Sequence, residues 1–101
     1  MQQYLVKISF EAKDQIRNIL EYLFFVFKSK QAYDAVKKDF FETVDRLSYT
    51  AGVIPESDNE KLRKRRLKII HFKSHGYIML FRVDANIATI VEVHHETENY
   101  T

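Results

Sequence analysis

Hydrophobic residues in the first half of the chain follow a helical spacing after one short β-type segment. The stretch YLVKISF, Tyr4 to Phe10, is rich in β-forming residues and predicts a first strand. Apolar positions then recur every three or four residues, which predicts a helix capped by Ser9 and running to about Lys28. A second helix is predicted from a cap at Ser29 to about Tyr49. The predicted buried positions are Ala12, Ile16, Ile19, Leu20, Leu23 and Phe27 in the first helix, and Tyr33, Val36, Phe40, Val44 and Leu47 in the second.

In the second half the pattern changes to the short apolar runs of strands. The segment TAGVIPESDNE contains a Gly and the only Pro, and it predicts a loop. Three strands are predicted after it: RLKIIHF at 66–72, YIMLFRV at 77–83 and IATIVEV at 87–93. The short links KSHG and DAN make these strands an antiparallel meander.

The predicted order is therefore β-α-α-β-β-β, which indicates a two-layer α+β fold. Both helices need a shared apolar layer, so we expect them on one face of a small, mostly antiparallel sheet. The first strand must join the same sheet, but the sequence does not give its neighbour. The length of 101 residues predicts a single domain over residues 1–101.

Composition narrows the class of protein. Hydrophobic residues make up 46% of the chain, which is enough for one core and too much for a disordered protein. The chain has no cysteine, which excludes disulfides and thiolate metal sites. The N-terminus lacks the pattern of a secretion signal, and the longest apolar stretch, YLFFVF, is too short to span a membrane. We therefore expect a cytoplasmic protein without a membrane partner.

The net charge of +2 hides an uneven distribution. The run KLRKRRLK at 61–68 has six basic residues out of eight, whereas 92–98 holds three Glu and no Lys or Arg. The basic run is interpreted either as a solvated loop and strand start or as a surface that binds an anion such as RNA phosphate. The predicted anion-binding residues are Lys61, Arg63, Lys64, Arg65, Arg66, Lys68 and Lys73.

Three stretches together resemble the RelE/ParE family of toxins from type II toxin–antitoxin modules. They are VKISFEAKDQIRNILEYL, GYIMLFRVDANIATIVEV and the ending HHETENY, so the resemblance covers nearly the whole chain. The resemblance implies a small toxin that inhibits growth and is held inactive by a cognate antitoxin. It also implies either ribosome-dependent cleavage of mRNA or, for ParE-type members, inhibition of DNA gyrase. Operator DNA would be bound only through the complex with the antitoxin.

The sequence departs from the nuclease members at the positions that handle phosphate. Ile78 stands where they carry a catalytic Arg, Thr97 and Glu98 replace a basic pair, and Glu92 replaces another Arg. Two further catalytic Lys of the family fall near Ile69 and His71. The remaining catalytic candidates are His71, Arg82, His95 and Tyr100. A His-based acid and base pair stays open, because His titrates near neutral pH.

Adjacent His94 and His95 raise a separate question. Strand alternation predicts that His95 shares a face with Val93 and Val91, and His94 with Glu92 and Ile90. Two interpretations stay open: one histidine is a packing residue while the other is solvated, or His95 acts in catalysis. A zinc site from His71, His75, His94 and Glu92 is disfavoured because no ligand spacing supports it, and no metal or cofactor is expected.

The apolar end of the first helix has two interpretations. Phe24 and Phe25 fill positions between those of the helical stripe, so they are either buried between elements or covered by the antitoxin. Taken together, these observations favour an mRNA-cleaving toxin whose partners are the antitoxin, the ribosome and mRNA. The alternatives are a gyrase inhibitor without nuclease activity and a diverged corepressor bound to its antitoxin.

Overall fold

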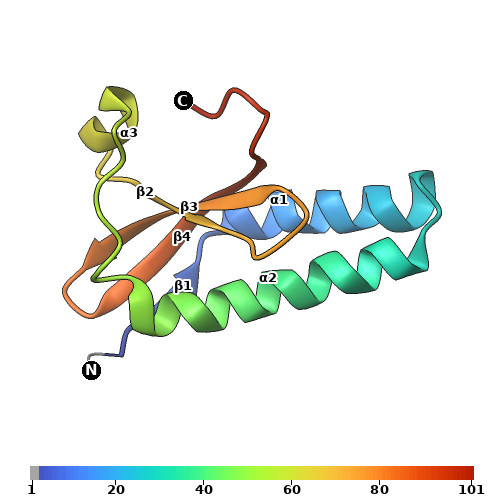
Figure 1. The fold of residues 1–101 in the computed structure, drawn as a ribbon, viewed down its shortest axis with the longest axis horizontal. Coiled ribbons are helices and arrows are strands. Elements are labelled where there is room, and N and C mark those ends of the chain that lie inside the picture. The colour runs from blue at the N-terminus through green and yellow to red at the C-terminus, as the bar shows by residue number, and fades with distance from the viewer. Residues whose placement is uncertain (1–2) are drawn as a thin grey trace.

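The computed structural model describes residues 3–101 and shows two long helices beside a four-stranded sheet (Figure 1). The elements are β1 (Leu5–Ile8), α1 (Phe10–Glu21), the π-helical segment η1 (Tyr22–Val26), α2 (Lys30–Thr50), α3 (Glu60–Lys64), β2 (Lys68–His71), β3 (Tyr77–Asp84) and β4 (Ile87–His95). The predicted α+β class and the β-α-α-β-β-β order of the main elements are confirmed. The short helix α3 was not predicted, because its five residues lie inside the basic run and give no periodic pattern.

The sheet has the strand order β1-β4-β3-β2. Strands β2, β3 and β4 form the predicted antiparallel meander, and β1 pairs in parallel with β4, with Leu5 opposite Ile87 and Ile8 opposite Ile90. The first strand thus finds its neighbour in the last strand, 82 residues further along the chain. Only the tertiary structure supplies this pairing.

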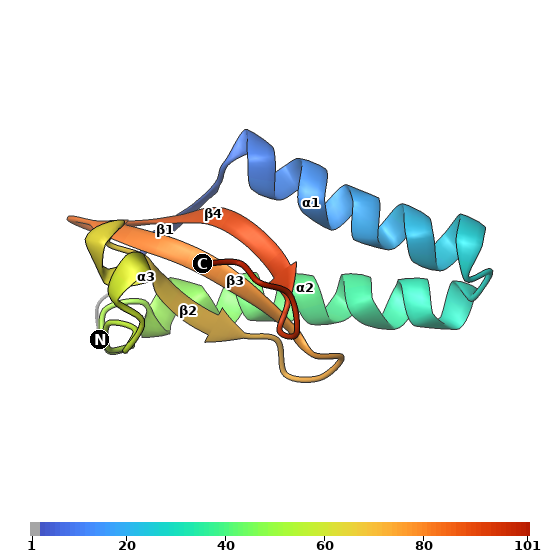
Figure 2. The same cartoon turned by 90° about the horizontal axis from the view of Figure 1, so that it is seen from above.

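Serine caps fix where the two long helices begin. The Ser9 hydroxyl accepts from the Ala12 N–H at 3.0 Å and donates to the Val91 carbonyl at 2.8 Å, so it joins the start of α1 to β4. The Ser29 hydroxyl accepts from the Ala32 N–H at 3.0 Å. Both caps satisfy backbone donors that a helix leaves unpaired at its first turn. Figure 2 shows that the hairpin of α1 and α2 extends past the end of the sheet.

The main core lies between this hairpin and the sheet. Phe81, Met79 and Ile90 are fully buried there from the sheet side, and Leu47 is fully buried from α2. Full burial of such a side chain contributes about 1.5–3 kcal/mol. None of the helices within residues 3–101 is both long enough and apolar enough to cross a membrane.

A second, smaller core covers the opposite face of the sheet. It consists of Leu62, Leu67, Ile78 and Leu80, and Tyr100 packs against it. In Figure 1, α3 and the C-terminal segment accordingly lie on the side of the sheet away from α2. The central strand β3 is therefore buried on both faces.

A β-bulge in β4 changes which side chains share a face. Leu80 pairs with Glu92 but Phe81 pairs with Ile90, so Val91 is an extra residue between them. Ile90 belongs to the main core, whereas Val91 packs on the second core. The predicted grouping of His94 with Ile90, and of His95 with Val91, was therefore wrong, because alternation holds only as far as the bulge.

Candidate functional site

On the second face of the sheet, one histidine lies between two carboxylates. The His94 Nε2 atom is 2.7 Å from a Glu92 oxygen, and its Nδ1 atom is 2.9 Å from a Glu98 oxygen. The His94 and Glu92 side chains are only 15% and 12% exposed, whereas Glu98 is 53% exposed. The guanidinium of Arg65, which follows α3, forms an ion pair with the second oxygen of Glu92. This cluster links α3, β4 and the chain after β4.

The ion pairs shift the pKa of each member toward its charged form. Burial by itself would lower the pKa of His94, but the hydrogen bonds to Glu92 and Glu98 outweigh it and raise that pKa above 6.5. Burial by itself would raise the pKa of Glu92, but His94 and Arg65 outweigh it and lower that pKa below 4.5. The hydrogen bond from His94 also lowers the pKa of Glu98 below 4.5.

Tyr100 closes the cluster from the solvent side. Its ring stacks on the His94 ring with centroids 5.8 Å apart and planes 22° apart. The same Tyr100 side chain packs on the second core beside α3. The C-terminal aromatic residue therefore docks on the sheet, and His94, which the sequence analysis assigned to packing or solvation, forms the centre of the cluster.

The predicted catalytic residues are divided between the two faces of the sheet. Arg82 lies on the second face, where it donates to the Arg65 carbonyl at 3.0 Å, and Tyr100 lies on the same face. His71 is 67% exposed and has a Glu96 oxygen 4.0 Å away. His95 contacts the Tyr77 ring, and Tyr77 packs on the main core. The structure therefore does not bring His95 together with Arg82 and Tyr100.

The predicted anion-binding residues are also divided. Lys64 pairs with Glu60 at 3.4 Å, Arg66 pairs with Asp84 at 2.8 Å, and Arg65 is held by Glu92. These acids neutralise part of the positive charge of the basic run. Lys61 lies in α3, next to the ion pair that Glu60 forms with Lys64.

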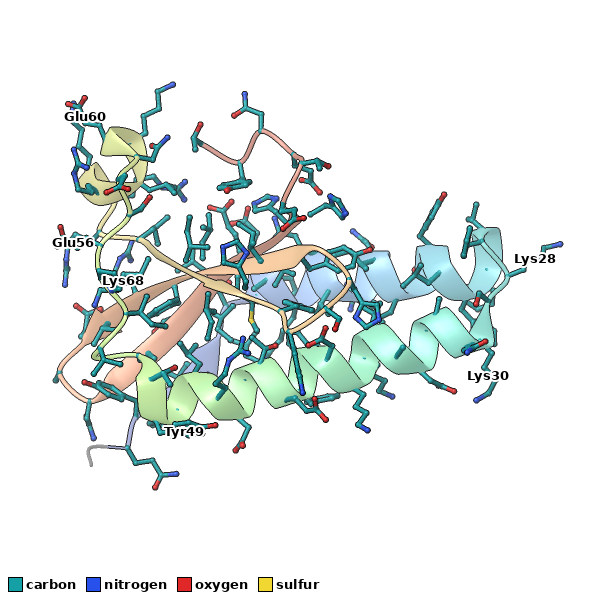
Figure 3. The ribbon with its side chains drawn as sticks, viewed as in Figure 1. Lys28, Lys30, Tyr49, Glu56, Glu60 and Lys68 are labelled. Atoms are coloured by element: carbon teal, nitrogen blue, oxygen red, sulfur yellow. The ribbon has the colours of Figure 1, made fainter. Side chains whose placement is uncertain are left out.

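Three members of the basic run still line one shallow hollow of about 280 Å³. They are Arg63, Arg66 and Lys68, and Glu56, Leu67 and Val83 complete its lining. Figure 3 shows Glu56 and Lys68 on the same side of the molecule, next to α3. Lys73 follows the far end of β2 and lines different hollows, beside Lys38 of α2. The hollow near α3 is therefore the part of the predicted anion surface that the fold assembles.

A buried carboxylate that the sequence analysis missed holds the loop between β2 and β3. Asp39 of α2 is 5% exposed and accepts from the N–H groups of Lys73 at 3.0 Å and Ser74 at 2.9 Å. It also contacts the Nδ1 atom of His75 at 2.9 Å. Asp39 lies next to Phe40 on the buried side of α2, although the sequence pattern placed it off the predicted apolar stripe of this helix.

Of the four residues considered for a zinc site, only His94 and Glu92 contact each other. His75 contacts Asp39, His71 faces Glu96, and His94 contacts Glu92. Within residues 3–101, no group of three or more His, Cys, Asp or Glu side chains is arranged to hold a metal ion.

An apolar groove of about 490 Å³ runs between α1 and α2 at the far end of the hairpin. The Phe24 ring lies 4.9 Å from the Phe25 ring and 5.4 Å from the Tyr33 ring, in edge-to-face contacts. Phe25 is 67% exposed and Phe41, from the other wall, is 58% exposed. The full lining is Ile16, Arg17, Leu20, Glu21, Phe24, Phe25, Tyr33, Lys37, Phe40 and Phe41. Phe24 and Phe25 thus belong to an open surface. Tyr33 and Phe41 also line this surface, although the sequence placed Tyr33 on the buried stripe of the second helix and Phe41 beside that stripe.

Two exposed aromatic residues of the groove lie in a π-helical turn. The segment YLFFV forms η1, in which Tyr22, Phe24, Phe25 and Val26 are exposed while Leu23 packs against the main core. π-Helical turns are rare and occur often at functional sites. Lys28 and Lys30, labelled in Figure 3, flank the connection at this end of the hairpin.

Comparisons with known proteins agree on the fold. Residues 6–100 match the family model described as the ParE toxin of the type II toxin–antitoxin system parDE. A chain from the chromosomal ParDE toxin–antitoxin system of P. aeruginosa superposes with a TM-score of 0.73 at 15% sequence identity, covering 92% of this chain and 96% of that chain. A search of curated protein sequences found no match.

Proposed function

Because the chain belongs to the ParE family of type II toxins, we propose that it inhibits growth by binding DNA gyrase and not by cutting mRNA. The observation that carries this choice is the division of the candidate nuclease residues. Cleavage through a 2′-hydroxyl needs a base, an acid and cations around one phosphate. Here His95 lies against Tyr77 on one face, while Arg82 and Tyr100 lie on the other. His71 shares that second face, but it is 67% exposed and faces the carboxylate of Glu96.

The charges on the second face also disfavour phosphate chemistry. Glu92 and Glu98 are ionised at neutral pH, since hydrogen bonds to His94 keep the pKa of each carboxyl group below its ordinary value of 4.5. Two carboxylates beside His94 repel a phosphate and neutralise the positive charge that the ring carries when protonated. A protein target that meets mixed charges and an aromatic ring fits this face better than RNA does.

We further propose that the antitoxin covers the groove between α1 and α2. Exposed aromatic side chains of this size are costly in water, and a contiguous apolar groove is typical of a protein interface. An amphipathic segment of the antitoxin would place its apolar side chains against Phe24, Phe25 and Phe41. Arg17, Glu21 and Lys37 would provide polar contacts at the edge of the groove.

The mechanism is tested by two measurements on the same protein. Purified toxin is added to DNA gyrase in a plasmid supercoiling assay, and 5′ ends of transcripts are mapped in cells that express it. We expect inhibition of gyrase with intact transcripts, and the same result for His95→Ala. Cuts within translated codons that disappear in His95→Ala would instead establish the ribonuclease function that the sequence favoured.

A third outcome distinguishes the corepressor. If neither gyrase nor transcripts are affected, and the complex with the antitoxin binds operator DNA more tightly than the antitoxin alone, the chain is a diverged member that acts in regulation. Gel-shift titration at a fixed salt concentration measures this difference, since DNA affinity depends strongly on salt.

The antitoxin surface is tested with a charge placed in the groove. Phe25→Glu should weaken binding of the cognate antitoxin by at least about tenfold, because a carboxylate would be desolvated against aromatic rings. Val53→Glu is the matched control, since Val53 is 81% exposed and lies outside the groove. Equal affinities of the two variants, measured by calorimetry, would refute this placement.

A further inference from the structure

We infer that Glu96–Thr101, the C-terminal strap, is held on the second face of the sheet by a doubly protonated His94 and is released when that ring loses a proton. The inference concerns a conformational device within this chain and does not depend on the target of the toxin. It rests on the positions of the atoms around His94 and on what the strap covers.

The hydrogen-bond chemistry of the His94 ring requires two protons. Its two nitrogens lie 2.9 Å and 2.7 Å from oxygens of Glu98 and Glu92. An ionised carboxylate only accepts hydrogen bonds, whereas a neutral imidazole has one N–H and one lone pair. A neutral ring would therefore direct its lone pair at one of the two carboxylates. Both contacts are satisfied together only by the imidazolium ion.

The two carboxylates belong to different parts of the structure, so the ring joins them. Glu92 lies within β4 and is itself held by Arg65, while Glu98 lies in the strap. Glu98 also accepts from the His95 N–H at 3.1 Å, and its own N–H donates to the His95 carbonyl at 3.0 Å. Loss of one ring proton would thus weaken the contact that joins the strap to β4.

Tyr100 gives the closed strap its apolar contact. Its ring covers the His94 ring at 5.8 Å and packs on the second core, where Leu62, Leu67 and Ile78 are at most 1% exposed. The view in Figure 2 shows the C-terminal segment crossing over the strands on the α3 side. Release of the strap would expose part of this core and the stacked face of His94.

The surrounding charges set the direction of the pH effect. Glu92 from β4, Glu98 from the strap and Arg65 next to α3 are the charged groups around His94, and Tyr100 lies over the ring. On the neighbouring strand His94 is paired with the apolar Ile78, and beyond it His71 of β2 faces Glu96. The two carboxylates next to the ring stabilise its charge.

The sign of the effect follows from the three pKa shifts. The pKa of His94 is raised above 6.5, so its contribution is complete below about pH 6.5 and is lost as pH rises through the folded-state pKa. The pKa values of Glu92 and Glu98 are lowered below 4.5, so their contribution is lost as pH falls through their folded-state values. The strap should be most firmly closed between about pH 4.5 and 6.5.

Nuclear magnetic resonance on the full-length protein tests the inference directly. Ring ¹⁵N shifts of His94 report its protonation, and hydrogen exchange of the Glu98 amide reports strap opening. We expect exchange of this amide, corrected for its intrinsic pH dependence, to rise about tenfold as His94 loses its proton. Exchange of the Phe81 amide in the main core serves as the internal reference for global unfolding.

Two variants separate His94 from His71, which faces the strap through Glu96; His95, whose Nδ1 atom lies 2.7 Å from the Thr97 hydroxyl oxygen, is unchanged in both. His94→Gln places a neutral side chain between the carboxylates, so exchange at Glu98 should be fast at every pH. His71→Gln is the matched control, because His71 also faces the strap through Glu96, and it should keep the pH profile of the wild type. If His94→Gln unfolds, Tyr100→Ala offers a second route, since it removes the stacked ring and leaves both ion pairs.

Three results would overturn the inference. One is exchange at Glu98 that stays constant while His94 titrates. Another is a wild-type profile in His94→Gln. The third is a profile that His71→Gln abolishes, which would assign the effect to His71 and Glu96.

Discussion

Replacing Asp39 by Ala should destabilise the protein far more than removing an exposed acid from the same helix. Asp39 is 5% exposed and accepts from the Lys73 and Ser74 N–H groups, and it contacts His75 Nδ1 at 2.9 Å. Its carboxylate thus attaches α2 to the loop that leads from β2 into β3. Without it, the loop would lose its attachment at this point.

The magnitude follows from the number and kind of hydrogen bonds. A hydrogen bond to a charged group contributes about 1.5–3 kcal/mol, but the loop residues are exposed and water replaces part of the loss. We expect Asp39→Ala to cost about 3 kcal/mol, and Asp39→Asn about 2 kcal/mol because the amide keeps one acceptor. For a domain of this size, 3 kcal/mol corresponds to a decrease in Tm of roughly 10–20 °C.

Urea unfolding followed by far-UV circular dichroism measures these differences, with Asp34→Ala as the control. Asp34 is 55% exposed in its pair with Lys30, so its loss should change the free energy of unfolding by no more than about 0.5 kcal/mol. If Asp39→Ala and Asp34→Ala were equally stable, the attachment of the loop by Asp39 would be refuted.

The same variant has a pH dependence of known sign. Burial by itself would raise the pKa of Asp39, but hydrogen bonds from His75, Ser74 and Lys73 outweigh it and lower that pKa below 3.8. Its contribution is therefore present above about pH 3.8 and is lost as pH falls through the folded-state pKa. The stability difference between wild type and Asp39→Ala should shrink in acid, and a constant difference would contradict an ionised Asp39.

Three further substitutions test local features of the fold by the same urea measurement. Ser9→Ala should lower the free energy of unfolding by about 1–2 kcal/mol, and Ser29→Ala by about 1 kcal/mol. The loss is larger for Ser9 because this residue caps α1 and also donates a hydrogen bond to β4. A smaller loss for Ser9→Ala than for Ser29→Ala would contradict the link to β4. Gly76→Ala should lower the free energy of unfolding by about 1–2 kcal/mol, because the backbone φ angle at this position is +72° and the new Cβ would lie 3.3 Å from side-chain atoms of His95 and Glu96. An unchanged urea midpoint would contradict this strain. Phe81→Ala should lower the free energy of unfolding by about 3–5 kcal/mol, because Phe81 is fully buried. Val53→Ala, at an exposed position, should lower it by less than about 0.5 kcal/mol. Similar losses for the two variants would contradict the assignment of Phe81 to the core.

Local patterns in the sequence were sufficient for the main elements of the fold. The spacing of Ile16, Val36 and Phe40 marked the helix faces that are buried, and Ser9 and Ser29 marked the helix starts. These features depend on residues close together in the chain, so a periodic pattern records them. The short turns likewise determined the antiparallel meander.

The candidate site was predictable only in part. Phe24 and Phe25 stood out because they break the helical stripe, and the basic run drew attention to Arg63, Arg66 and Lys68, which share one hollow. The hydrogen bonds of Asp39 and His94 could not be predicted from the sequence pattern. An isolated acid or histidine gives the same sequence signal whether its partners are buried carboxylates, loop amides or water.

What the sequence by itself determined is therefore the α+β class, the order of the main elements and most of the buried stripes, since these follow from nearest-neighbour geometry. The prediction of Phe27 as a buried position was wrong, because it lies at the end of the hairpin and is 62% exposed. The tertiary structure decided the pairing of β1 with β4, the π-helical η1, the bulge at Val91 and the cluster around His94. The strand pairing, the bulge and the cluster each depend on contacts between distant segments. The bulge shows the limit most directly, because one extra residue moved Ile90 to the opposite face from Glu92 and His94, and only the pairing partner in β3 records that shift.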